Sequence, residues 1–158
     1  MNIRTAILAA SMLALTAAGA PAADFPKSGT TKATGYWTQT TLDELQGWEA
    51  DWQPNLNVGM GIIRNETGGG PFDKSFLRCI GQDTLAAGTY LTYGSCTETD
   101  IAGDKIFITY NAESFTFVGG TGKYKGITGG GTLKSETVFQ GGKIWAGVIS
   151  YEKHWEIK

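Results

Sequence analysis

The chain has 158 residues, of which 23 are glycine and 4 are proline, and a formal net charge of −2. Its length fits a single domain, and an aromatic content of 11% with so small a net charge argues against a disordered chain. A pI of about 5.4 argues against a nucleic-acid-binding protein, and one histidine with two cysteines is too few for a Cys/His zinc site.

The first segment, residues 1–22, has the three parts of a secretory signal peptide. Arg4 precedes an apolar stretch from Ala6 to Ala18, and the small residues Ala20-Pro21-Ala22 form a signal-peptidase cleavage site. A transmembrane anchor is the alternative, but this stretch is shorter than the roughly 20 residues that span a bilayer. We therefore predict a signal peptide over residues 1–22, a single domain over residues 23–158, and export to the periplasm or out of the cell.

The rest of the chain reads mainly as strands, because its apolar residues recur with a period of two and turn residues separate the runs. The predicted strands are Thr31–Gln39, Asn55–Asn65, Ser75–Gly81, Thr89–Thr97, Lys105–Asn111, Ser114–Val118, Gly131–Phe139 and Lys143–Glu156. Between the first two, the stretch Thr41–Gln46 resembles a helix, because Thr41 and Glu44 form a capping box. We predict one short helical turn there.

The second predicted strand has two distinct faces. Its apolar face consists of Leu56, Val58, Met60 and Ile62. Arg64 follows on this face, so an internal position would require a carboxylate partner or an acidic ligand, whereas a position at the strand end leaves the charge solvated. Residues 66–74, which follow, are expected to form a flexible loop and not a domain boundary.

The two cysteines, Cys79 and Cys96, lie 17 positions apart. In an exported chain an even number of cysteines favours a disulfide, and two strands joined by a loop would bring this pair together. A redox-active pair is the alternative, but the sequence contains no C-x-x-C motif. We predict a structural disulfide.

Three acidic residues, Glu98, Asp100 and Asp104, lie close together in the sequence. Carboxylates so close can bind Ca²⁺, but their spacing is not that of an EF-hand loop. Because acidic and glycine residues are also common in turns, we predict a turn here and no metal site.

Consecutive hairpins of this kind form an antiparallel meander. About eight strands with one apolar face close most naturally into a barrel, because closure removes exposed edges. A sandwich is the alternative, but glycines within the predicted strands allow the sharp coiling that a small barrel needs. We predict an all-β, antiparallel, eight-stranded barrel, closed or nearly closed.

The most distinctive motif is the glycine-rich segment Phe117–Thr132. It is not a Walker A loop, because Gly122-Lys123 is followed by Tyr124, and its glycine spacing does not fit a dinucleotide-binding loop. A glycine turn, a tyrosine plug and a glycine-rich strand instead describe a tight corner of a barrel.

This corner carries a family resemblance. The run Val118-Gly119-Gly120-Thr121-Gly122-Lys123-Tyr124, followed by a glycine-rich strand, resembles the GGTG-x-[FY]-x-x-x-x-G hairpin of the allene oxide cyclase-like and dirigent-like barrels. The resemblance implies an eight-stranded, calycin-type barrel, and the export signal and the predicted disulfide fit a bacterial exported member. Members bind small apolar molecules in the barrel, and some steer cyclisations or radical couplings by shaping the cavity. The resemblance supplies no catalytic residue and no cofactor.

The last predicted strand has one aromatic face, which also carries Lys153 and Trp155, and an opposite face that carries Glu152 and His154. Trp145 and Tyr151 share the face that we expect to point inward, because burial stabilises by about 25 cal/mol per Å² of apolar surface. Glu152 and His154 would then face solvent. A register shift of one residue would turn both into the lumen, where they are the candidate catalytic acid and base.

Aromatic side chains with polar tips suit the wall of a small-molecule cavity, since they offer an apolar face and a hydrogen-bonding group. Ordinary core packing is the competing interpretation of each. The candidate ligand-binding residues are Trp37, Arg64, Tyr93, Tyr110, Trp145 and Tyr151.

These observations favour a non-enzymatic exported barrel that binds a small, largely apolar molecule in an aromatic-lined lumen. One alternative is an isomerase or cyclase that acts by conformational control, and a second is a structural or protein-interaction barrel with a filled core. We expect no cofactor, no nucleic-acid partner and no embedding in a membrane, and the sequence leaves a homo-oligomer open.

Overall fold

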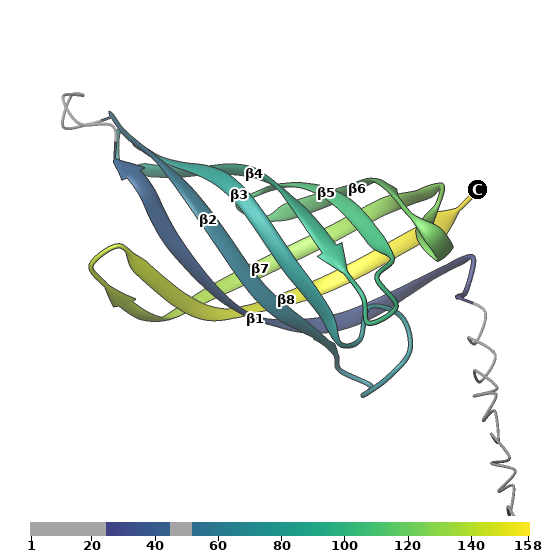
Figure 1. The fold of residues 1–158 in the computed structure, drawn as a ribbon. Helices are drawn as coiled ribbons and strands as arrows, with labels where there is room; N and C mark the ends of the chain where they lie inside the picture. The colour runs from purple at the N-terminus through teal and green to yellow at the C-terminus, as the bar shows by residue number, and fades with distance from the viewer. Residues whose placement is uncertain (1–24, 45–51) are drawn as a thin grey trace, which may run out of the picture.

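The computed structural model describes residues 25–44 and 52–158. The predicted signal peptide lies outside these residues. Eight antiparallel strands form a closed barrel in sequence order, as the sequence predicts (Figure 1). The strands are β1 Ser28–Glu44, β2 Trp52–Asn65, β3 Ser75–Ala86, β4 Thr89–Thr99, β5 Lys105–Asn111, β6 Ser114–Gly120, β7 Ile127–Gly141 and β8 Ile144–Ile157, with a 3₁₀ turn, η1, at Gly122–Tyr124.

Pairing of the first and last strands closes the barrel. In register, β1 and β8 pair from Ser28 opposite Glu156 to Thr40 opposite Ile144. Every other strand pairs with its neighbour in the chain, so the fold is a pure meander without crossovers. Within the described residues, no helix is both long enough and apolar enough to cross a membrane.

The predicted helical turn at Thr41–Gln46 is wrong for the part of it that the structure describes. Residues 41–44 continue β1, and residues 45 and 46 lie outside the described residues. The Thr41 amide donates to the carbonyl oxygen of Lys143 at 2.9 Å, and Thr41 lies opposite Asn57 of β2. Pairing with both neighbouring strands therefore overrides the local capping signal.

Aromatic side chains close one end of the barrel. Phe72 is 2% exposed, although it belongs to the loop of residues 66–74 between β2 and β3. Its ring lies 5.1 Å from that of Trp155 and stacks on that of Phe117 at 5.8 Å. Phe25 packs against Tyr124 at 4.9 Å from the chain segment before β1. The loop thus supplies the central plug of this end.

The glycine-rich motif forms the predicted corner at the same end. Gly122 has φ of 53°, in the left-handed region, and Tyr124 is buried in the plug. The Asp104 carboxylate accepts a hydrogen bond from the Lys123 amide at 3.3 Å. A left-handed glycine, an aromatic plug and an acidic side chain from the β4–β5 turn therefore define this corner.

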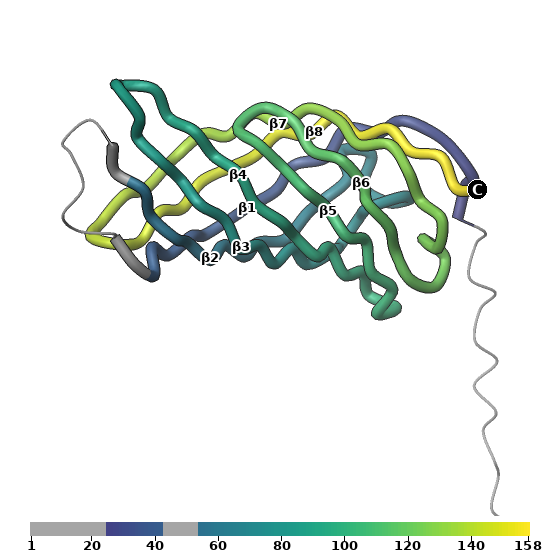
Figure 2. The backbone as a smooth tube through the Cα atoms, turned by 90° about the horizontal axis from the view of Figure 1, so that it is seen from above, coloured from purple at the N-terminus to yellow at the C-terminus, as the bar shows by residue number. Residues whose placement is uncertain are grey.

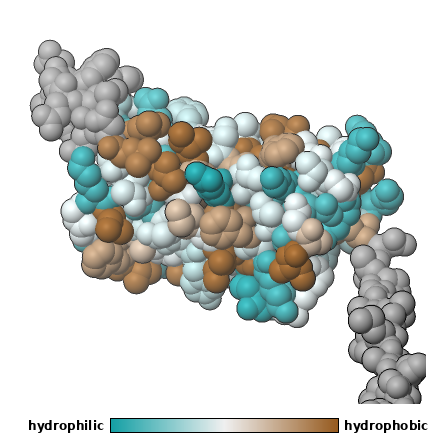
Figure 3. All heavy atoms as spheres, in the orientation of Figure 1, coloured by the Kyte–Doolittle hydropathy of each residue, from teal (hydrophilic) through white to brown (hydrophobic). Residues whose placement is uncertain are grey.

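The apolar face of β2 points outward. Ile63 and Asn57 are buried inside the barrel at 1% and 2% exposure, whereas Met60 and Ile62 are exposed. Ile62 lies opposite Tyr36 of β1 and Phe76 of β3, which are also exposed. Figure 3 shows apolar side chains gathered in several patches on the outer surface. A homo-oligomer would cover such patches and stays a prediction.

The predicted disulfide joins Cys79 of β3 to Cys96 of β4. The two residues lie directly opposite each other, with Cα atoms 4.0 Å apart. Both line the interior cavity described below. The bridge is therefore part of the wall of the lumen, and the prediction of a disulfide is confirmed.

Replacing Cys79 by Ser is expected to lower the free energy of unfolding by about 3 kcal/mol, because the bridge restricts the unfolded chain. Urea denaturation of oxidised protein measures the difference. The matched control is the native protein in reductant, whose stability should fall to that of the variant. Two reactive thiols in the native, unreduced protein would contradict the bridge.

Candidate functional site

The barrel encloses a cavity of about 390 Å³. All eight strands contribute to its wall, so it is the lumen of the barrel. The volume lies in the range of small-molecule sites. Its lining is mostly apolar and aromatic, with Ile63, Phe115 and Leu133 among the lining residues. At one end of the cavity, the aromatic plug around Phe72 closes the barrel.

The β5–β6 hairpin is shorter than the β3–β4 and β7–β8 hairpins, so the barrel wall is shorter on this side. The β4–β5 pairing begins only at Tyr93 opposite Asn111, and the β6–β7 pairing runs from Ser114 to Thr116. Among the described residues, the first residues of β4 therefore pair only with β3, and the second half of β7 pairs only with β8. Figure 2 shows the hairpin ending well short of the tips of its neighbours. Asn111 and Ala112, at the tip of this hairpin, line the lumen.

Asp83 of β3 places a carboxylate in the lumen. Its Oδ2 atom accepts a hydrogen bond from Gln39 Nε2 at 2.9 Å and another from Asn57 Nδ2 at 2.8 Å. The residue is 8% exposed. The strands β1, β2 and β3 therefore cooperate to hold one buried carboxylate in a fixed orientation.

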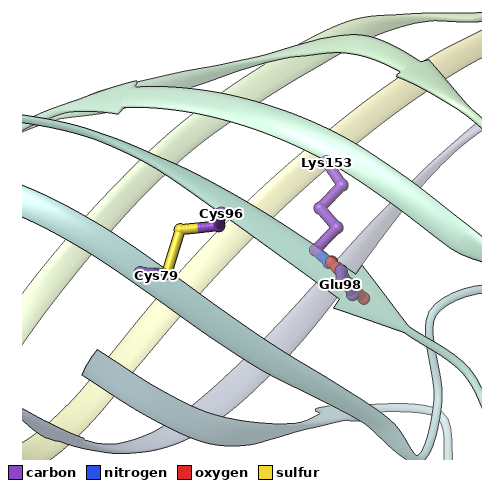
Figure 4. Close-up of a disulfide and its surroundings, with 4 residues drawn as sticks. All are labelled: Cys79, Cys96, Glu98 and Lys153. Atoms are coloured by element: carbon purple, nitrogen blue, oxygen red, sulfur yellow. A yellow bond between two sulfur atoms is a disulfide. The ribbon is translucent and has the colours of Figure 1, made fainter. Parts of the chain in front are cut away.

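A second carboxylate in the lumen is neutralised. Lys153 of β8 points toward Glu98 of β4 (Figure 4), and its Nζ lies 2.7 Å from Glu98 Oε2. Ser75 donates a hydrogen bond to Glu98 Oε1 at 2.6 Å. Both charged side chains are no more than 2% exposed. The ammonium also lies 4.6 Å from the centre of the Phe72 ring, so this pair connects the floor of the lumen to the aromatic plug.

Two tyrosines near these acids stay neutral over the physiological range. Burial, helped by the nearby charge of Asp83, raises the pKa of Tyr110 to about 12. Burial and the charge of Glu98 raise the pKa of Tyr151 above its usual range. Both phenols are therefore hydrogen-bonding groups that add no charge to the lumen.

The structure brings four of the predicted ligand-binding residues together. Trp37, Tyr110, Trp145 and Tyr151 line the lumen. Trp37 Nε1 is buried without a hydrogen-bond partner in the described part of the chain. Buried donors in folded proteins are nearly always hydrogen-bonded, so Trp37 Nε1 is an exception among the described residues.

Two of the predicted ligand-binding residues lie outside the lumen. Arg64 is on the outward face of β2, where its Nε donates to Asp73 Oδ1 at 2.9 Å. Tyr93 is 61% exposed. Both have the opposite parity from the buried residues of their strands, because Ile63 and Cys96 point inward. The expectation that Arg64 and Tyr93 line the cavity is therefore corrected.

The candidate acid and base lie on the outer surface. Glu152 and His154 are exposed, and Glu152 pairs with Lys32 at 3.1 Å. Their neighbours Tyr151, Lys153 and Trp155 are buried. The register is therefore the expected one, and the shift that would turn Glu152 and His154 inward does not occur.

Sequence reasoning missed the two lumen carboxylates as site residues. A usable signal existed, because strand residues two apart share a face. Asp83 shares the face of Cys79, and Glu98 shares the face of Cys96. Because the bridge between these cysteines points into the barrel, both carboxylates do so too. The three acidic residues that cluster in the sequence lie in different places. Asp100 and Asp104 hold the β4–β5 turn and the adjoining corner by hydrogen bonds, whereas Glu98 faces inward.

No family model matches the chain, and no curated protein matches its sequence. Solved structures match its fold. The pterocarpan synthase dirigent protein GePTS1 aligns with a TM-score of 0.54 and 14% identity, over 84% of this chain and 88% of that one. The pterocarpan synthase dirigent protein PsPTS1 aligns with the same score and identity, over 85% of this chain and 99% of that one. The fold is a dirigent-like barrel, and the resemblance read from the glycine-rich corner is confirmed at that level.

Proposed function

We propose that this dirigent-like barrel binds a small, largely apolar molecule in its lumen. The single observation that carries the proposal is the cavity of about 390 Å³ with its aromatic lining. A core packed to ordinary density leaves no void of this size, so the cavity also argues against a barrel with a filled core. The ligand would contact the rings of Trp37, Trp145 and Tyr151, which line the cavity.

The proposal is supported by how the wall is built. The disulfide, the β1–β8 closure and the buried Glu98–Lys153 pair hold the lining in place without a ligand. A preformed site of this kind avoids the cost of ordering side chains on binding. The residues act by shape and burial, and the proposed role requires no reaction.

Native mass spectrometry of protein purified without added ligand tests the proposal. We expect extra mass that disappears on denaturation, because a ligand buried in the lumen dissociates slowly. Gly59 lines the lumen and its added Cβ would make only ordinary contacts, so Gly59→Phe should fill the cavity and remove the extra mass. The matched control, Thr109→Phe on the outer face of β5, should keep it. Absence of extra mass, together with no uptake of an added naphthalene probe, would contradict the proposal.

A second candidate is an isomerase or cyclase that works by holding one reactive conformer of its substrate. Two observations favour it: the similarly folded solved proteins are named pterocarpan synthases, and Asp83 places a proton-carrying group beside Tyr110 in the lumen. In this case Asp83, and not Glu152 or His154, would be the proton carrier. Turnover of a bound compound that Asp83→Asn abolishes, with binding retained, would favour this candidate.

We also propose that the protein is exported. The Cys79–Cys96 bridge is compatible with an oxidising compartment, and residues 1–22 carry the predicted signal peptide. Amino-terminal sequencing of protein recovered from the periplasm or medium should begin at Ala23. Recovery only of chains that retain Met1 would contradict export by this signal.

A further inference from the structure

The charges that line the lumen do not balance. Asp83 and Glu98 supply two carboxylates, and Lys153 is the one cationic side chain among the described residues that line the cavity. Lys153 lies 2.7 Å from Glu98, with both side chains no more than 2% exposed, so its charge is already compensated. Asp83 therefore leaves the lumen with one uncompensated negative charge.

The hydrogen-bonding pattern of Asp83 also indicates that this carboxylate lacks a partner. Both amide donors, from Gln39 and Asn57, are bonded to Oδ2. Among the side chains that the structure describes, none donates a hydrogen bond to Oδ1. Since a carboxylate can accept about four hydrogen bonds, one face of this group is free for a donor in the cavity. A buried charge without a counterion is costly, and a cationic ligand would remove that cost.

Aromatic rings surround the same part of the lumen. Tyr90 and Tyr110 line it and both experience the charge of Asp83, which helps to raise the pKa of each phenol. Trp37 and Trp145 also line the lumen, and Trp145 lies opposite Gln39, which donates to Asp83. Ring faces attract organic cations, and the attraction strengthens when the site is desolvated. An aromatic wall beside one free carboxylate is the arrangement that recognises an organic ammonium group.

We propose that the lumen selects apolar amines, with the ligand ammonium donating a hydrogen bond to Asp83 Oδ1 and its apolar body packed against the aromatic wall. This inference rests on the proposed binding function and narrows its ligand class. A neutral alcohol could donate to Oδ1 but would leave the charge uncompensated. An apolar carboxylate would add a second negative charge to the lumen and be repelled.

Three probes of one shape test this selectivity: naphthalen-2-ylmethylamine, naphthalen-2-ylmethanol and 2-naphthoate. Isothermal titration calorimetry at pH 7, where the amine is protonated, gives the Kd of each. We expect the amine to bind about tenfold more tightly than the alcohol, a difference equivalent to about 1.4 kcal/mol. The carboxylate should bind most weakly.

Two variants test whether Asp83 causes the preference for the amine. Asp83→Asn removes the lumen charge and should bring the Kd of the amine to that of the alcohol. The matched control, Glu152→Gln, removes one negative charge from the outer surface and should leave the tenfold preference intact. Thermal melting of both variants shows whether they are folded, and the ligand series on the native protein stands without them.

The outcomes separate this inference from the proposed function. Equal affinity for the amine and the alcohol in the native protein would overturn amine selectivity and leave the lumen as a binder of apolar molecules. A preference that survives Asp83→Asn would overturn the assignment to Asp83. Failure of all three probes to bind, together with absence of extra mass in native mass spectrometry, would overturn both proposals.

Discussion

Replacing Lys153 by Met is expected to lower the free energy of unfolding by about 3–5 kcal/mol. Met has a similar shape but no charge, so the change leaves Glu98 buried without its cation. Among the described residues, Glu98 would keep only the hydrogen bond from Ser75, at 2.6 Å. Urea denaturation followed by tryptophan fluorescence measures the loss.

A second substitution identifies the cause of this loss. In Lys153→Met with Glu98→Leu, both charges are gone, and most of the stability should return, because a buried ion pair is often replaceable by apolar groups. The control is Lys32→Met on the outer surface, where the pair with Glu152 is about two-thirds exposed. Exposed pairs contribute about 0–1 kcal/mol. Equal losses for Lys153→Met and Lys32→Met would contradict the buried-charge explanation.

Replacing Gly122 by Val is expected to lower the free energy of unfolding by about 3 kcal/mol, since left-handed backbone is costly for a β-branched residue and the site is crowded. Gly122 has φ of 53°. An added Cβ would collide with the carboxylate of Asp104, which accepts a hydrogen bond from the Lys123 amide. The glycine-rich corner would have to open. Thermal and urea denaturation measure the change.

Gly142 offers a matched control for this prediction. It also has a left-handed φ, of 57°, but nothing lies within 4 Å of its added Cβ. Gly142→Val should therefore show the backbone cost alone, about 1–2 kcal/mol. The excess loss in Gly122→Val measures the crowding at Asp104. An unchanged melting temperature for Gly122→Val would contradict the turn geometry.

The strands could be read from the sequence because their signals are local. Alternation of apolar and polar residues identified all eight strands, with β5 matching its predicted bounds. Glycine and asparagine marked the turns. The prediction of a helical turn at Thr41–Glu44 was wrong because it also relied on a local signal. The capping signal there competes with pairing to Asn57 and Lys143. Only the closed barrel supplies those partners.

Alternation alone determines two faces of each strand but not which face points inward. For β8 the large aromatic residues indicate the inward face, and Tyr151 is buried as expected, together with Trp155. For β2 hydrophobicity indicates the wrong inward face. Its apolar face lies outside, while Asn57 of the other face is 2% exposed. The amide of Asn57 is held inside by Asp83, a contact between strands that hydrophobicity does not encode.

By itself, then, the amino-acid sequence determined the all-β meander, the disulfide and the glycine-rich corner, because each depends on residues near one another along the chain or on pairing of neighbouring strands. Tertiary structure alone decided the content of the lumen. The Glu98–Lys153 pair joins residues 55 positions apart across the barrel, and Asp83 gains its donors from β1 and β2. Such partners depend on the stagger of the strands at closure, a property of the whole sheet. That stagger pairs one lumen carboxylate with a lysine and leaves the other without a cationic partner among the side chains that the structure describes.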